Sequence, residues 1–148
     1  MSRSRLLVLI LLATPVVLAA QAKPSKTVAP KAIADSFHQA YPHATILNVS
    51  KEREKGRTIY EVESRDGATH RDLLYSIDGR VIEAEETIPV AELPPAVRSA
   101  LATAAPGATI LRTERVTREG STRYEIGIRV GGKSRELVFD PTGMAVKP

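Results

Sequence analysis

The chain has 148 residues, of which 43% are hydrophobic and 26% charged, and its formal net charge is +4. This length allows one compact domain or two small ones that share a core, and the hydrophobic fraction is too high for a disordered chain. The absence of cysteine and tryptophan excludes disulfides, cysteine-based metal centres and thiol nucleophiles. With only three histidines, four tyrosines and two phenylalanines, neither a haem pocket nor a platform for stacking nucleic-acid bases is expected.

The first 22 residues have the three parts of an export signal. Arg3 and Arg5 form a basic start, residues 6–18 form an apolar run, and Ala20-Gln21-Ala22 has the small-x-small form of a cleavage site. The apolar run is shorter than the roughly 20 residues that span a bilayer as a helix. We therefore predict cleavage after Ala22, a periplasmic or secreted location, and no membrane attachment after cleavage. An uncleaved anchor is the alternative.

Removal of this signal changes the charge balance. Arg3 and Arg5 leave with it, so 19 basic and 17 acidic residues remain, a net charge of +2. Basic and acidic residues alternate in the rest of the chain instead of forming a basic block, so no nucleic-acid partner is expected. Residues 23–29 are polar and show no periodicity, which predicts a flexible lead-in.

The remaining chain contains two copies of one sequence unit. A shift of 64 residues aligns its two halves without a gap. The segment 41–47, YPHATIL, falls on 105–111, APGATIL, and three glycines and two prolines also coincide. The matched residues are Gly56 with Gly120, Gly67 with Gly131, Gly79 with Gly143, Pro30 with Pro94, and Pro42 with Pro106. Two copies are too few for a solenoid, so the pattern predicts a duplicated domain, with repeat 1 at residues 30–88 and repeat 2 at 94–148.

Each repeat begins with a short helix and continues with strands. In repeat 1, Ile33, Phe37 and Tyr41 recur every four residues after Pro30; in repeat 2, Val97, Leu101 and Ala105 do so after Pro95. Alternating segments separated by glycine turns predict antiparallel strands. The expected strands are 45–53, 57–65, 69–77 and 80–88 in repeat 1, and 109–118, 121–130, 133–140 and a short 144–147 in repeat 2.

The predicted fold class is therefore α+β, with each helix packed on an antiparallel sheet of about four strands. A unit of about 60 residues is marginally stable alone, so we expect the two sheets to join or pack closely, with both helices on one side. The aromatic residues fit covered positions on the helices and strands. The first strand of repeat 1, with Ile46, Leu47 and Val49, does not alternate cleanly, which is compatible with either a bulge or a partly covered second face.

Acidic residues recur on the strand face that points away from the helices. If Asp66-Gly67 forms a two-residue turn, Glu61 lies opposite Asp72, and the same register in repeat 2 places Glu125 opposite Glu136. Like charges in direct opposition are unfavourable, so such pairs indicate a basic partner or a divalent cation, unless neighbouring arginines such as Arg129 simply neutralise a solvated face. The Gly131-Gly132 turn could shift the register by two and separate Glu125 from Glu136.

The order of elements resembles the PepSY-like family, also described as putative β-lactamase-inhibitor-like. The resemblance rests on the signal, the two helices, the Tyr-Glu-Val strand at 60–62, the Asp-Gly turns and the Leu-Leu-Tyr strand at 73–75, and it covers residues 30–147. It implies an exported, non-catalytic protein that presents a concave sheet to a protein partner, as a modulator of a secreted peptidase or other envelope enzyme. The candidate partner-binding residues are Glu61, Asp72, Glu125, Arg129 and Glu136.

No catalytic residue, cofactor or metal centre is assigned from the sequence. His38, His43 and His70 have no second histidine at ligand spacing, so they are expected at the surface or in turns. The alternatives are a protein that binds a small ligand or cation through the acidic pairs, and a structural homodimer that closes its own sheet edge.

Overall fold

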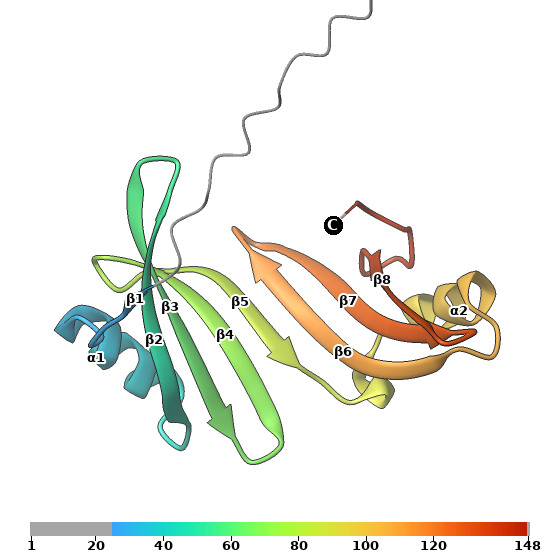
Figure 1. Cartoon of the computed structure of the whole chain (residues 1–148), viewed down its shortest axis with the longest axis horizontal. Coiled ribbons are helices and arrows are strands. Elements are labelled where there is room, and N and C mark those ends of the chain that lie inside the picture. The colour runs from blue at the N-terminus through green and yellow to red at the C-terminus, as the bar shows by residue number, and fades with distance from the viewer. Residues whose placement is uncertain (1–24, 148) are drawn as a thin grey trace, which may run out of the picture.

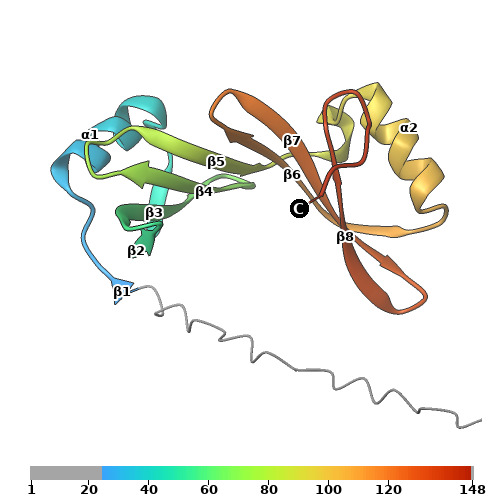
Figure 2. The ribbon, with the colours of Figure 1, turned by 90° about the horizontal axis from the view of Figure 1, so that it is seen from above.

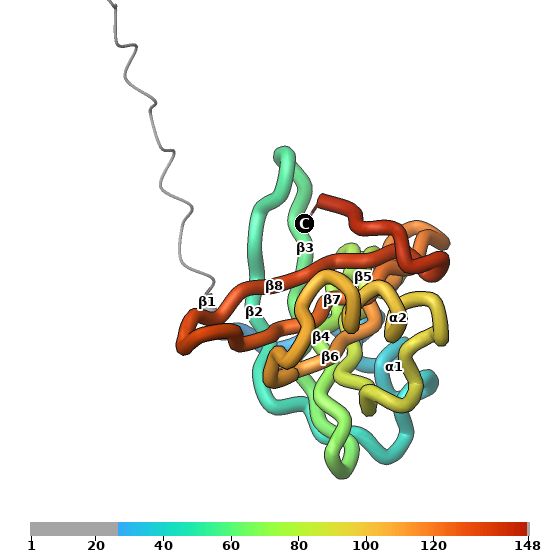
Figure 3. The backbone as a smooth tube through the Cα atoms, turned by 90° about the vertical axis from the view of Figure 1, so that its right-hand side faces the viewer, coloured from blue at the N-terminus to red at the C-terminus, as the bar shows by residue number. Residues whose placement is uncertain are grey.

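The computed structural model describes residues 25–147, so the predicted signal and its cleavage site lie outside the described residues. One antiparallel sheet of eight strands runs through both repeats in chain order, and β5 pairs with β6 to join them (Figure 1). Both helices lie on the same side of this sheet (Figures 2 and 3). The α+β class and the joined sheets are thus confirmed. The elements are β1 (Ser25–Lys26), α1 (Lys31–Ala40), β2 (Thr45–Glu54), β3 (Arg57–Asp66), β4 (Thr69–Ser76), β5 (Val81–Thr87), the 3₁₀ turn η1 (Val90–Glu92), α2 (Pro95–Ala104), β6 (Thr109–Arg118), β7 (Ser121–Val130) and β8 (Lys133–Phe139).

The 64-residue shift holds element by element. The helices α1 and α2, and the strand pairs β2 with β6, β3 with β7 and β4 with β8, begin at equivalent positions. Of the two readings of the first strand of repeat 1, the bulge is present, since the pairing register shifts between Ile46 and Asn48. Repeat 2 has a bulge at the equivalent place, between Ile110 and Arg112. The outermost strand of the second copy differs from the prediction. Repeat 1 has four strands, whereas the predicted strand at 144–147 is reduced to an isolated bridge between Ala145 and Phe139.

The lead-in is also more ordered than the sequence indicated. Residues 23–29 were expected to be flexible, but Ser25 and Lys26 pair with β2, and the Thr27 amide donates to the Val49 carbonyl at 3.0 Å. The physical reason is that strand addition uses backbone groups alone, so a polar segment without periodicity can still pair with the exposed edge of β2.

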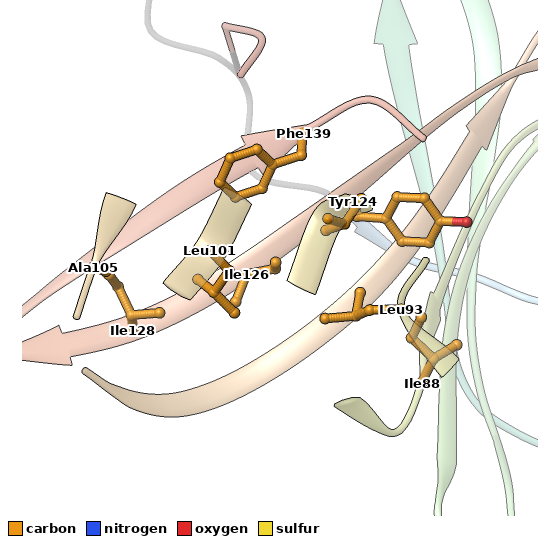
Figure 4. Close-up of a cluster of buried hydrophobic side chains, with 9 residues drawn as sticks. Ile88, Leu93, Leu101, Ala105, Tyr124, Ile126, Ile128 and Phe139 are labelled. Carbon is orange, nitrogen blue, oxygen red and sulfur yellow. The ribbon is translucent and has the colours of Figure 1, made fainter. Parts of the chain in front are cut away.

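Each repeat has its own hydrophobic core between its helix and the sheet. In repeat 1, Ile33 and Phe37 of α1 are fully buried against strand residues that include Val62, Leu73 and Tyr75. In repeat 2, the corresponding cluster joins α2 to β7 and β8 and extends into the linker (Figure 4). Its members are Ile88, Leu93, Val97, Leu101, Ala105, Tyr124, Ile126, Ile128 and Phe139. Because α1 and α2 are each only 10 residues long, this packing and not intrinsic propensity holds them in place.

A glycine in each repeat lets a turn pass directly against the helix. A Cβ placed on Gly79 would lie 2.5 Å from the Ala32 carbonyl oxygen, and one on Gly143 would lie 2.6 Å from that of Ala96. Both glycines also have positive φ, 84° and 83°. These equivalent contacts fix the position of each helix relative to its hairpin, and no other residue type fits there without displacement.

The helices leave the opposite face of the sheet uncovered, and we call this side the open face. Strand alternation directs residues such as Glu61, Asp72 and Glu125 to it, while their neighbours Val62, Leu73 and Ile126 enter the cores. Neither helix of residues 25–147 has the length and hydrophobicity that crossing a lipid bilayer requires.

Candidate site on the open face

The hairpin registers differ by two residues from the prediction. Asp66 pairs with Thr69, so the loop consists of Gly67 and Ala68, and Asp72 lies opposite Glu63 and not Glu61. Gly67 occupies the first loop position with a φ of 59°, a conformation that glycine adopts readily. The predicted opposition of Glu61 and Asp72 was therefore wrong, because the turn begins one residue later than the Asp-Gly pattern indicated.

The same shift occurs in repeat 2. Val130 pairs with Lys133 across the Gly131-Gly132 loop, which places Glu125 opposite Val138 and Glu136 opposite Gly127. The predicted direct opposition of Glu125 and Glu136 was thus wrong as well, and the alternative register, with the two separated, is the observed one.

The shifted registers assemble a longer line of carboxylates than either predicted pair. Each of the six strands from β3 to β8 contributes one acidic side chain to a row that crosses the open face and passes from repeat 1 into repeat 2. We call this set the acidic row. Its members are Glu63, Asp72, Glu85, Glu114, Glu125 and Glu136. Directly opposed pairs within the row are Glu63 with Asp72, Asp72 with Glu85, and Glu114 with Glu125.

The centre of the acidic row lies at the junction of the repeats. Glu85 on β5, Glu114 on β6 and Glu125 on β7 each offer a carboxylate oxygen, and these three atoms lie within 4.8 Å of one another. We call these three residues the junction cluster. Glu114 is only 8% exposed, which is unusual for an acidic residue on an uncovered sheet face.

Burial against apolar side chains perturbs the cluster. Glu85 lies opposite Val116, which is fully buried although it belongs to the open face. This burial, followed by the charges of Glu114, Glu125 and Asp72, raises the pKa of Glu85 from 4.5 to about 7. Burial also raises the pKa of Glu114, although Arg112 and a hydrogen bond with Glu85 oppose the rise. The pKa values of both carboxyls are therefore raised, and the pair binds a proton more readily than two separate glutamates would.

Asp72 continues this environment into repeat 1. Burial, followed by the charges of Glu61 and Glu63, raises its pKa above 3.8. Glu63 is better satisfied, since Asn48 Nδ2 donates to its Oε1 at 2.9 Å. Charge repulsion along the acidic row thus extends beyond the junction.

Arginines neutralise only part of the acidic row. Within residues 25–147, the ion pairs to it come from Arg112 and Arg123 and reach Glu114, Glu125 and Glu136. The Arg112 Nη2–Glu136 Oε2 and Arg123 Nε–Glu125 Oε1 distances are 2.8 and 2.7 Å. Arg112 Nε also lies 2.9 Å from Glu114 Oε2, but its N–H is not aligned with that oxygen, which has no hydrogen-bond partner in the described part of the chain. The row therefore keeps excess negative charge.

The other predicted residues lie outside the junction cluster. Glu61 faces the open side and accepts a hydrogen bond from Ser50 Oγ at 3.0 Å. Arg129 lies farther along β7, and its Nε is 3.5 Å from Ser134 Oγ, so it does not join the carboxylates. Sequence reasoning missed Glu85 and Glu114. The 64-residue shift aligns Glu114 with Ser50, and this alignment could have placed Glu114 opposite Glu125 on the open face. The position of Glu85 beside them could not be predicted, because it depends on the pairing of β5 with β6.

The fold and the acidic face together define a class: a duplicated helix-on-sheet protein with an uncovered, carboxylate-rich sheet surface. A model of the PepSY-like family, described as putative beta-lactamase-inhibitor-like, matches residues 19–83 and 81–147, and the chain belongs to this family. No curated protein sequence matches the chain.

Solved structures share the fold at low sequence identity. A putative periplasmic protein from Bacteroides eggerthii superposes with a TM-score of 0.67 at 16% identity, covering 82% of this chain and 88% of its own. A BLIP-like protein from Bacteroides fragilis gives a TM-score of 0.62 at 19% identity, covering 82% and 85%. A DUF2874 family protein from Bacteroides uniformis gives 0.66 at 16% identity, covering 81% and 88%. The similarity extends over both repeats and concerns the fold.

Proposed function

We propose that this protein is a non-catalytic binding module of the cell envelope, and that its open face holds a basic segment of a partner protein. The observation that supports this most strongly is the acidic row, which places one carboxylate from each of six consecutive strands on a single uncovered face. Membership of an inhibitor-like family and the periplasmic description of a solved relative support the envelope location and the binding role.

Charge complementarity specifies the partner's chemistry. The acidic row carries six carboxylates and receives ion pairs from only two arginines in residues 25–147, although the predicted mature chain as a whole is basic. A lysine- or arginine-bearing loop would offset this repulsion, and like-charge surfaces would be rejected. We therefore expect partner affinity to fall as the salt concentration rises.

A pull-down with a charge-reversal variant tests this function. The purified protein is used to capture partners from envelope extract, and wild type is compared with Glu125→Lys and with Asp35→Lys as a control of equal charge change. Asp35 is exposed on α1, where it pairs with Lys31, away from the open face. A stoichiometric basic partner lost with Glu125→Lys and retained with Asp35→Lys is expected.

Two other results would contradict the proposal. A partner retained equally by both variants would exclude the open face as the binding surface. Recovery of the protein alone, with a dimeric mass in solution, would favour the homodimer in which a sheet edge is closed by a second copy.

A further inference from the structure

Three of the hairpin turns in residues 25–147 lie at one end of the open face. They follow β2, β4 and β6, and Figure 1 shows them at the same end of the sheet. An ion pair joins two of these hairpins, since Arg118 Nη2 at the end of β6 lies 3.5 Å from Glu54 Oε1 at the end of β2. Within the sheet, β3, β4 and β5 separate these two strands. The sheet therefore curves strongly at this end, and a hollow lies between the hairpins.

This hollow, which we call the tip hollow, has a volume of about 320 Å³. Ile59 of β3 and Val81 and Ile82 of β5 line it with apolar surface. Ile59 is only 5% exposed and belongs to the open face, because it precedes Glu61 by two residues on β3. Small-molecule sites are cavities of about 300–1,000 Å³ with largely apolar linings and a few polar groups. The tip hollow is therefore large enough for a small ligand.

The charged residues around the tip hollow are mostly basic. Lys55, Arg57 and Arg80 line it, and none of the three forms an ion pair within residues 25–147. The ion pair that joins the hairpins also lines the hollow and is neutral in itself. Glu119 is the remaining acidic residue of the lining, so three basic residues against one acidic residue leave a net charge of +2. Because clefts lined by one sign of charge concentrate ions of the opposite sign, the tip hollow favours an anion.

Comparison of the repeats shows that the hairpin turns do not require these basic residues. Lys55 and its equivalent Glu119 have the same backbone conformation, with φ angles of 49° and 50°. Arg57 is replaced in repeat 2 by Ser121. The turn geometry thus accepts an acidic or a neutral residue as well as a basic one. The fold does not explain the unpaired basic side chains around the tip hollow, whereas an anionic ligand would.

We propose that the tip hollow binds a small organic anion that carries a carboxylate on an aliphatic group. The aliphatic group contacts Ile59, Val81 and Ile82. The carboxylate pairs with Arg57 and Arg80, because planar guanidinium groups match the geometry of a carboxylate. A free aliphatic acid and the C-terminal residue of a peptide both present this chemistry. No member of the acidic row lines the tip hollow, so this site does not depend on the proposed partner surface.

A methyl NMR titration tests the site directly. The purified protein, labelled with carbon-13 in its isoleucine and valine methyl groups, is titrated at neutral pH with acetate, butyrate, hexanoate and uncharged hexanamide. We expect hexanoate to shift the methyl signals of Ile59, Val81 and Ile82 until they saturate, with a Kd on the order of 1 mM. Each CH₂ removed from the acid should weaken binding by up to about fourfold, because less apolar area is buried. Hexanamide should bind more weakly than hexanoate, because it lacks the charge.

Two variants and one control decide whether the arginines bind the carboxylate. Arg57→Gln and Arg80→Gln should each weaken hexanoate binding on the order of tenfold, because each removes a charged hydrogen-bond donor. Arg129→Gln removes the same charge near the other end of β7, where it does not line the hollow, and should bind as wild type does.

Titration with N-acetyl-leucine, which mimics a peptide C-terminus, distinguishes the two sources of the carboxylate. Binding tighter than that of hexanoate would identify the C-terminal residue of a peptide as the ligand. Binding weaker than that of hexanoate would identify a free aliphatic acid.

Any of four results would overturn the proposal. They are unchanged methyl signals of the lining residues at tens of millimolar hexanoate, equal affinity for acetate and hexanoate, equal affinity for hexanamide and hexanoate, and equal hexanoate affinity in wild type and both arginine variants. The pull-down relies on Glu125, which does not line the tip hollow, so the failure of one proposal leaves the other intact.

Discussion

Replacing Glu85 with glutamine should stabilise the protein at neutral and alkaline pH and have little effect near pH 4.5. Glu85 has a pKa of about 7 in the folded state and an ordinary value of 4.5 when unfolded. Between these values the folded state binds the extra proton, so stability falls as pH rises through this window, and the full penalty is present above it. The Glu85→Gln amide mimics the protonated carboxyl and removes the penalty.

The expected size follows from the shift. The difference in pKa corresponds to at most about 3 kcal/mol. Glu85 is partly exposed, and solvent screening reduces this to about 1–2 kcal/mol. The charges that produce the effect belong to neighbouring strands: Asp72 on β4, Glu114 on β6 and Glu125 on β7, with Arg112 acting in the opposite sense near Glu114.

Urea unfolding between pH 4.5 and 8.5 measures this difference. The free energy of unfolding of Glu85→Gln should exceed that of wild type by an amount that grows from near zero to about 1–2 kcal/mol. Glu52→Gln, on the same face, should show no such growth. A gap between wild type and Glu85→Gln that does not vary with pH would refute the buried, repelled state of Glu85.

Other substitutions test the fold and the comparison of repeats. Gly79→Ala should lower the free energy of unfolding by more than about 2 kcal/mol, because it adds a clash with the Ala32 carbonyl to the roughly 1–2 kcal/mol of positive-φ strain. Gly67→Ala has open space around it, so its free energy of unfolding should fall only by the amount of that strain. Equal losses for the two variants in urea unfolding would contradict the close approach of Gly79 to the helix. Phe37→Ala should cost about 3–5 kcal/mol by creating a cavity in the core of repeat 1, and hydrogen exchange should show protection lost first in that repeat; uniform loss in both would argue against two separate cores. Glu114→Ser should raise the unfolding midpoint, and a lower midpoint would show that the carboxylate contributes to the fold itself.

Much of the architecture was predictable because the duplication repeats local signals. Apolar residues at helical spacing, such as Ile33 and Phe37, predicted α1, and the shift of 64 predicted α2. The irregular alternation around Leu47 indicated either a bulge or a partly covered face in repeat 1, and the bulge is present there and at the equivalent place in repeat 2. The prediction of a fourth strand in repeat 2 was wrong. Gly143 indicated a turn followed by a strand, but only the single bridge at Ala145 is formed.

The candidate site was less predictable for two physical reasons. Hairpin register depends on which residue begins the turn, and placing Gly67 first moved every cross-strand pair by two. More importantly, Glu85 and Glu114 belong to different repeats, and only the β5–β6 pairing brings them together. A turn pattern describes adjacent strands within a hairpin, whereas this contact is made across a longer connection that contains α2.

The difference between the repeats bears on the proposed partner. Ser50 donates to Glu61 within repeat 1, whereas Glu114 and Glu125 lie directly opposite each other in repeat 2, where Arg112 and Arg123 form ion pairs with them. No ion pair within residues 25–147 reaches Glu63, Asp72 or Glu85. Basic side chains of a partner that contacts the whole acidic row would therefore offset the most uncompensated charge along β3, β4 and β5.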